Sequence, residues 1–244
     1  MSTPTIAERV RALDWRHLSE DLDVHGYALT PRVANAHLLR SNECDALIRL
    51  FGDDERYRNT VDMRRLRFGS GTYRYFKSPL PAIVQALRKR LYPPLARIAN
   101  SWAERLGDAA RYPKTLSLFL EHCHENGQKQ PTPLIFRYQE GDYNAFHQDV
   151  YGKIGFPFQV LTVLSRHGEY SGGEFMLYKL RPRSQSLGQV VTPARGQMLI
   201  FPNRYKPEPR AQGGYYRAEL RHGVSRLHSG RRYSLGIIFH DAEK

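Results

Sequence analysis

Apolar residues in the first 130 positions recur with a spacing that is typical of helices. The i, i+3, i+4, i+7 spacing of one helical face runs from residue 80 to 91 and again from 95 to 106. Pro93 and Pro94 separate the two runs, and a proline inside a helix removes a backbone hydrogen bond. The pattern therefore predicts two helices with a break between them.

Two further segments carry helix signals. Ser41 is a favourable N-cap residue, and acidic residues follow it in the first turn before an apolar stretch, so a helix is predicted to begin there. A shorter helix is predicted from Thr115 to His124, ending near Gly127. Residues 1–130 are thus expected to form a mainly helical region that supports the rest of the fold.

From residue 131 the pattern changes to short runs of apolar, aromatic and β-branched residues. Glycine, proline, serine and asparagine separate these runs, as turns do in an antiparallel barrel or sandwich. The predicted strands cover residues 133–139, 158–165, 173–179, 188–193, 196–202 and 233–240. We therefore predict an α+β protein in which residues 131–244 form a double-stranded β-helix (a jelly roll, cupin-like). The helical region 1–130 is expected to pack on one of its sheets, in one compact unit.

Bulk composition narrows the class of protein. No apolar run approaches the roughly 20 residues that cross a bilayer, and the first residues lack the pattern of a secretory signal, so we expect a cytoplasmic protein without membrane contact. Only two cysteines occur, which argues against a disulfide framework. The net charge of +13 favours a polyanionic or acidic partner, and the alternative is a basic surface that only maintains solubility.

His147 and Asp149 stand two apart in an apolar run that is typical of a strand. Residues at this spacing point to the same side of a strand, so an imidazole nitrogen and a carboxylate oxygen can reach one point. Burying both groups is costly unless something compensates them, and a metal ion does so most simply. Two histidines and one carboxylate with open coordination positions are the set that holds non-haem Fe(II). A second histidine is therefore expected further along the chain.

His222 is the best candidate for that second histidine, because a basic residue, Arg232, and a strongly apolar final strand follow it. His228 is the alternative, but it stands only four residues before Arg232 and leaves little room for a turn between the metal and the basic residue. An H-x-D motif alone has little specificity. Its specificity rises when His222, Arg232 and Ser234 follow in this order on β-patterned segments.

Within residues 131–241 this order of residues resembles the Fe(II)- and 2-oxoglutarate-dependent dioxygenases, and the prolyl 4-hydroxylase-like branch in particular. The resemblance implies that His147, Asp149 and His222 bind iron and carry the catalysis. It also implies Fe(II), 2-oxoglutarate and O2 as cofactor and cosubstrates, with ascorbate as a reductant. The implied reaction is hydroxylation of a substrate C–H bond with release of succinate and CO2.

The same resemblance assigns the far carboxylate of 2-oxoglutarate to Arg232, with Tyr138 as a hydroxyl donor. The physical chemistry agrees, since a planar guanidinium makes two parallel charge-assisted hydrogen bonds to a carboxylate. Ser234 lies two residues after Arg232 and can add its hydroxyl on the same strand face. Arg231 should face the opposite side of that strand, where its charge would be solvated.

The sequence leaves the substrate open. The motif resemblance favours a protein, a peptide or an amino-acid side chain. Two segments, 56–77 and 203–221, mix basic and aromatic residues in a way that suits phosphate contact and base stacking, which suggests oxidative demethylation of alkylated DNA or RNA instead. The candidate substrate-binding residues are Tyr143, Arg204, Tyr205, Tyr215, Tyr216 and Arg217. One observation argues against demethylation: the second C-terminal arginine that is typical of the alkylation-repair branch is absent. A third interpretation is a catalytically inactive jelly roll that only binds a ligand.

Overall fold

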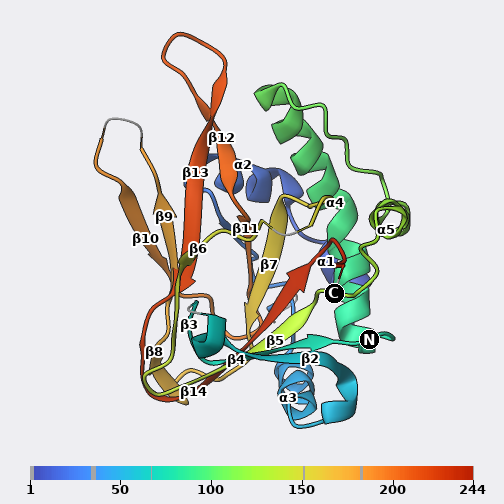
Figure 1. Ribbon diagram of the computed structural model, residues 1–244, viewed down its shortest axis with the longest axis vertical. Coiled ribbons are helices and arrows are strands. Elements are labelled where there is room, and N and C mark those ends of the chain that lie inside the picture. Colours follow the sequence, from blue (N-terminus) through green and yellow to red (C-terminus); the bar gives the residue numbers. More distant parts are fainter. Residues whose placement is uncertain (1–2, 34–36, 67, 151, 182–183, 244) are drawn as a thin grey trace.

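Two antiparallel sheets form the centre of the computed structural model, which describes residues 3–33, 37–66, 68–150, 152–181 and 184–243 (Figure 1). The strands are β1 (Ala28–Leu29), β2 (Tyr57–Asp62), β3 (Gly69–Ser70), β4 (Thr72–Phe76), β5 (Leu134–Gln139), β6 (Tyr143–His147), β7 (Phe158–Val163), β8 (Tyr170–Gly172), β9 (Phe175–Lys179), β10 (Leu187–Val191), β11 (Met198–Pro202), β12 (Tyr205–Pro209), β13 (Tyr215–Val224) and β14 (Leu227–Ile238). The helices are α1 (Ile6–Arg11), α2 (Trp15–His25), α3 (Ser41–Leu50), α4 (Ala82–Leu106) and α5 (Leu116–Glu125), with short 3-10 helices η1 (Asp54–Arg56) and η2 (Met63–Leu66).

The strand order distinguishes a larger and a smaller sheet. The larger sheet has the order β1-β11-β7-β14-β5-β4-β2, and the smaller sheet has the order β10-β9-β13-β6-β3. β8 pairs with β14, and β12 pairs with β13, beside these two paths. Many neighbouring strands come from distant parts of the sequence, as in a jelly roll. The predicted α+β class is confirmed, together with its helical N-terminal portion.

Successive side chains of β14 point alternately to the two faces of the larger sheet. Leu235 and Ile237 belong to the main hydrophobic core, which the helices share with this sheet. Arg232 and Ser234 occupy the alternate positions of the same strand and are buried on its other face. A second apolar cluster takes its members from both sheets and therefore fills the space between them. The polar residues of β14 thus face the inside of the barrel.

α4 is one continuous helix through Pro93 and Pro94, so the predicted break between two helices is wrong. The carbonyls that lose their helical donors belong to Lys89 and Arg90, and both of these residues are exposed to solvent. Apolar side chains on both sides of the prolines are buried in the main core, where α4 covers the outer face of the larger sheet (Figure 1). Packing of this long apolar face outweighs the local cost of the prolines. Within the described ranges, no helix combines the length and apolar character that a membrane crossing requires.

Several strands and helices lie where the sequence analysis did not predict them. β2 and β4 extend the larger sheet beyond β5, and β3 joins the smaller sheet, so the region before residue 131 contributes strands as well as helices. β13 was also not predicted, although Arg217, Glu219 and Arg221 alternate there with buried residues. That alternation is typical of a strand with one solvent-exposed face. The helices α1 and α2, the short strands β1, β8 and β12, and the two 3-10 helices were also not predicted.

Candidate metal centre

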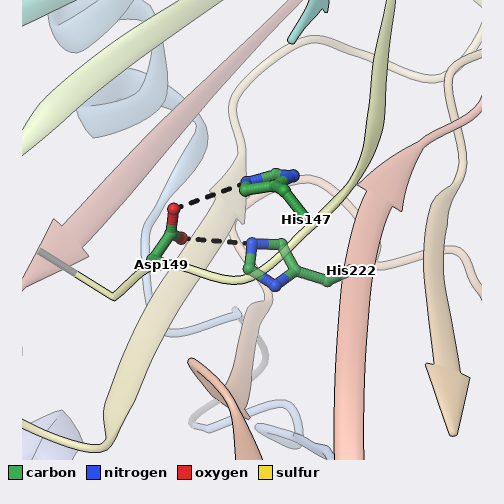
Figure 2. A group of neighbouring side chains, drawn as sticks. All are labelled: His147, Asp149 and His222. Carbon is green, nitrogen blue, oxygen red and sulfur yellow. Dashed lines mark ion pairs between the residues drawn. The ribbon is translucent and has the colours of Figure 1, made fainter. Parts of the chain in front are cut away.

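His147, Asp149 and His222 come together between the two sheets (Figure 2). His147 ends β6, and His222 lies opposite it on the paired strand β13, so strand register brings the two imidazole rings to a centroid distance of 4.3 Å. Asp149 directs its carboxylate toward both rings. Its Oδ1 is 3.5 Å from Nε2 of His147, and its Oδ2 is 3.2 Å from Nε2 of His222.

The three side chains are spaced so that they could share one ion. One ligand atom from each residue lies within 4.8 Å of the other two. Two donors that are about 2.1 Å from an ion and at right angles to each other lie about 3 Å apart, so small side-chain adjustments would bring all three onto one cation. Two imidazoles and one carboxylate on one face leave other coordination positions open, which suits Fe(II).

The protonation states of these residues suit a cation. Nδ1 of His147 donates to the backbone carbonyl of Ala145 over 2.8 Å, which leaves Nε2 unprotonated. Burial, together with the neighbouring His222, lowers the pKa of His147 and keeps its ring neutral. Burial by itself would raise the pKa of Asp149, but hydrogen bonds from His222 and Gln159 hold that pKa well below its usual value. The site therefore presents a charged carboxylate and a neutral imidazole, the forms that bind metals.

Aromatic side chains hold His222 in its orientation. Its ring stacks on Phe175 at a centroid distance of 6.0 Å and an interplanar angle of 14°, and it lies edge-on to Phe201 at 4.8 Å. Both phenylalanines belong to the apolar cluster between the sheets. The packed core therefore fixes the imidazole without any contribution from a ligand.

Gln159, on β7, is a residue of this centre that the sequence analysis did not identify. Its Nε2 donates to Oδ2 of Asp149 over 2.6 Å and lies 3.4 Å from Nε2 of His222. The side chain is only 8% exposed. The available signal was a polar amide in the apolar run Phe158–Val163, because a buried amide needs hydrogen-bond partners.

Leucine at position 159 would remove this hydrogen bond with little change in side-chain volume. We expect Gln159→Leu to weaken metal binding by about tenfold, because outer partners that orient a metal ligand contribute on this scale. Anaerobic titration of the apoprotein with Fe(II) measures the affinity. Gln189→Leu, on β10, is the matched control and should bind as the unaltered protein does. Equal affinities in all three proteins would show that Gln159 does not orient Asp149.

A buried arginine inside the barrel forms no ion pair with any described residue. Arg232 is 1% exposed, and two other arginines, Arg9 and Arg88, are buried to a similar degree. Arg9 and Arg88 each form an ion pair with a carboxylate, whereas no carboxylate pairs with Arg232 in the part of the chain that the structure describes. Its side-chain hydrogen bond joins Nη1 to Oγ of Ser234 over 3.4 Å. The carboxylate of Glu174 interacts with this guanidinium electrostatically but forms no ion pair with it. A buried guanidinium without a directly bonded carboxylate is costly, so this position favours an anionic ligand.

Tyr138 lies beside Arg232 on the neighbouring strand. The two residues are paired in register between β5 and β14, and Cζ of Arg232 is 5.8 Å from the centroid of the Tyr138 ring. Burial raises the pKa of the Tyr138 hydroxyl, which keeps its proton and can donate it in a hydrogen bond. Gly173, with φ +70°, packs closely here: a Cβ at this position would lie 3.0 Å from Cδ of Arg232, so a side chain would disturb the guanidinium.

A cavity of about 510 Å³ contains the candidate metal centre. Its lining includes His147, Asp149, His222 and Tyr138, whereas Arg232 lies next to Tyr138 and outside the lining. Much of the remaining wall is aromatic and consists of Phe68, Tyr73, Tyr75, Phe136, Phe175 and Phe201. The basic residues Arg58 and Lys153 also line the cavity. The segment 56–77 therefore contributes to this wall, and Arg67 of that segment lies outside the described residues.

The six candidate substrate-binding residues do not line this cavity. On the β12–β13 hairpin, Arg217 and Tyr205 both contact Asp108. The rings of Tyr215, Tyr216 and Tyr143 lie under the guanidinium groups of Arg105, Arg210 and Arg226, respectively. Arg204 immediately precedes β12. A substrate contact by these residues stays a prediction. His228 is exposed on β14 and is not part of the His147–Asp149–His222 group.

Comparison with known protein sequences agrees with this geometry. Residues 71–242, more than half of the chain, match the Oxygenase-NA family, which is described as an oxygenase, catalysing oxidative methylation of damaged DNA. An uncharacterized protein of Mycobacterium tuberculosis, from the strains CDC 1551 / Oshkosh and ATCC 25618 / H37Rv, is 42% identical over 168 residues. That alignment covers 68% of this chain and 72% of the mycobacterial protein.

Two solved structures share the fold. A prolyl-4-hydroxylase of Pseudomonas putida has 14% identity and a TM-score of 0.53, covering 92% of this chain and 97% of that one. A prolyl hydroxylase of Trichoplax adhaerens, in complex with a hypoxia inducible factor oxygen degradation domain peptide fragment, has 14% identity and a TM-score of 0.50, covering 97% and 92%. At this identity the two likenesses show the fold alone. The chain belongs to the Oxygenase-NA family and, as an oxygenase, is an oxidoreductase.

Proposed function

We propose that this protein is an Fe(II)- and 2-oxoglutarate-dependent dioxygenase that demethylates alkylated bases of DNA or RNA. In this proposal His147, Asp149 and His222 hold the iron. When bound, Fe(II) together with 2-oxoglutarate and O2 supplies the oxidation of a substrate C–H bond, with release of succinate and CO2. The neutral His147 ring and the charged carboxylate of Asp149 suit this ion.

The observation that carries the proposal is the buried Arg232, which forms no ion pair with the described residues, in the same barrel as the three candidate ligands. A dicarboxylic acid supplies that missing partner, because its far carboxylate can accept two parallel hydrogen bonds from one guanidinium. In this proposal Ser234, whose Oγ contacts Nη1 of Arg232, and Tyr138, whose ring lies beside the guanidinium, add hydroxyl donors for the same carboxylate. These three residues bind and orient the cosubstrate.

Three observations support a nucleic-acid substrate. The family description names damaged DNA, and the net charge of +13 attracts a polyanion. The aromatic wall of the cavity also offers rings on which a flat base can stack. Arg58 and Lys153 are in the same lining and can contact backbone phosphates. The likeness to the prolyl hydroxylases lies in the fold and does not favour a peptide.

The proposed reaction is an oxidation followed by an elimination. One C–H bond of a methyl group on a ring nitrogen becomes C–OH with one oxygen atom of O2, and the other oxygen atom enters succinate. The bond between carbon and the ring nitrogen then breaks, the nitrogen keeps the electron pair, the hydroxyl proton is lost to solvent, and formaldehyde leaves. The chain contributes binding, orientation and an aromatic wall that excludes water from the reacting groups.

Oligonucleotides that differ only in one N-methylated base test this function. With Fe(II), 2-oxoglutarate and ascorbate, we expect the methylated oligonucleotide to yield formaldehyde and succinate in equal amounts. The unmethylated control should yield no formaldehyde. Binding should weaken as salt rises, because phosphate contacts release counterions.

Peptides that contain proline form the second arm of the same experiment. Coupled turnover with a peptide and none with any methylated oligonucleotide would overturn demethylation in favour of protein hydroxylation. If no substrate and no uncoupled reaction produced succinate, the chain would be an inactive binding module. A binding constant that did not change with salt would also contradict nucleic acid as the substrate.

A further inference from the structure

A second cavity lies in the helical layer and is separate from the candidate metal centre. It has a volume of about 610 Å³, its walls come from α1, the first residue of α2, α4 and the start of α5, and it shares no lining residue with the first cavity. Its lining contains no acidic side chain and four basic ones: Arg11, Lys89, Arg90 and Arg97. We call this cavity the helical groove.

Three of the four basic side chains of the helical groove have no acidic partner among the described residues, and the fourth, Arg11, interacts electrostatically with Glu8. All four are exposed, and the described residues offer none of them a salt bridge or a side-chain hydrogen bond. Other arginines of the helical layer are paired, as Arg16 is with Glu20 and Arg105 is with Asp23. The helical groove is therefore a concave surface of positive charge, which is complementary to an acidic ligand.

The floor of the helical groove is apolar. Val10 and Leu116 are buried beneath it, and Trp15 lines it as a half-buried side chain whose indole Nε1 donates to the carbonyl of Val10 over 3.1 Å. Leu120 of α5 adds a further apolar side chain. This floor can accept apolar side chains of a ligand but offers little to a phosphate backbone.

The prolines of α4 lie in the same lining and change its hydrogen-bonding capacity. Pro93 and Pro94 have no N–H to donate, so the carbonyls of Lys89 and Arg90 lack their helical donors at this place. A peptide supplies N–H groups that can satisfy such carbonyls, whereas the phosphodiester backbone of a nucleic acid has no N–H donor. The basic rim and the apolar floor together favour an acidic polypeptide that carries apolar side chains.

We propose that the helical groove binds an acidic segment of a partner protein that also carries apolar side chains. Its carboxylates pair with the four basic residues at the rim, and its apolar side chains pack on the floor. The site is independent of the oxygenase chemistry, because the groove and the metal centre have no lining residue in common.

Trp15 provides a direct readout of binding. The only other tryptophan, Trp102, is buried, 3% exposed, and hydrogen-bonded to Asp23 over 2.6 Å. We expect a synthetic amphipathic peptide of Glu, Asp and Leu, without aromatic residues, to shift the emission of Trp15 in the full-length protein. Anisotropy of the same peptide carrying a dye measures the affinity. Trp15→Phe should remove the shift and keep the anisotropy change.

Charge reversal in the groove tests whether its basic rim is responsible. Arg90→Glu combined with Arg97→Glu should weaken peptide binding by at least about tenfold. Arg49→Glu combined with Lys129→Glu makes the same change of net charge at exposed positions outside the groove and should change affinity less than about threefold. Uncoupled succinate formation should be the same in both double variants, which shows that both remain folded.

Three outcomes would overturn the proposal. The first is a peptide that produces neither a Trp15 shift nor an anisotropy change at physiological salt. The second is an equal loss of affinity in the two double variants, which would mean that net charge alone attracts the peptide. The third is a single-stranded oligonucleotide that binds the groove more tightly than the peptide and displaces it, which would make the groove a nucleic-acid surface.

Discussion

Asp149→Ala is expected to abolish turnover and to weaken Fe(II) binding at least about 100-fold, because it removes the charged member of the candidate ligand set. The two imidazoles that remain carry no negative charge and cannot replace a carboxylate. Succinate formation from 2-oxoglutarate measures turnover, and anaerobic titration with Fe(II) measures the affinity. His147→Ala and His222→Ala should show losses of the same kind.

His228→Ala is the matched control for these three variants. His228 is an exposed histidine on β14, six residues after His222, and it contacts none of the candidate ligands. Its replacement should leave both turnover and iron affinity nearly unchanged. A loss equal to that of His222→Ala would show that the ligand set is wrong. Circular dichroism of each variant separates a lost ligand from a lost fold.

Arg232→Met is expected to raise the 2-oxoglutarate concentration for half-maximal turnover about 100-fold, equivalent to roughly 3 kcal/mol, since a buried carboxylate would lose both hydrogen bonds from the guanidinium. In contrast, the free energy of unfolding without ligand should not fall. Arg232 is a buried charge that forms no ion pair with the described residues, and methionine of similar size removes its desolvation cost. Metal affinity should change little.

Arg88→Met is the matched control for stability. Arg88 is equally buried, but it pairs with Asp241 at 2.7 Å and donates to the carbonyls of Ile238 and Phe239. Breaking such a buried pair should lower the free energy of unfolding by about 3–5 kcal/mol. Chemical denaturation of both variants, with and without 2-oxoglutarate, gives the comparison. If Arg232→Met destabilised the protein as much as Arg88→Met and left the 2-oxoglutarate requirement unchanged, Arg232 would be a structural residue.

The candidate ligands could be predicted because their arrangement is largely local. His147 and Asp149 are two residues apart in a β-patterned run, and backbone geometry alone places such residues on one side of the chain. His222 followed from its order along the chain relative to Arg232. The structure brings the three side chains together, and their binding of iron stays a prediction.

The wall of the cavity could not be predicted in the same way. The basic and aromatic residues of 203–221 lie on and beside the β12–β13 hairpin, outside the lining of the cavity, whereas Arg58, Phe68 and Tyr75 of the earlier segment line it. The two segments have a similar composition, and composition does not report distance. Only the pairing of β2, β3 and β4 with the barrel strands places the earlier segment at the site.

By itself the sequence determined the α+β class, most strands after residue 131 and the spacing of the H-x-D motif. These features follow from periodicity within single elements, where side-chain direction depends on the backbone alone. Tertiary structure decided that α4 continues through two prolines, that Gln159 reaches Asp149, and that Arg88 forms an ion pair while Arg232 forms none with the described residues. The physical reason is that these outcomes depend on which distant strands and helices pack together. Burial of an apolar face can outweigh a local penalty, and long-range contacts determine which group pairs with a buried charge.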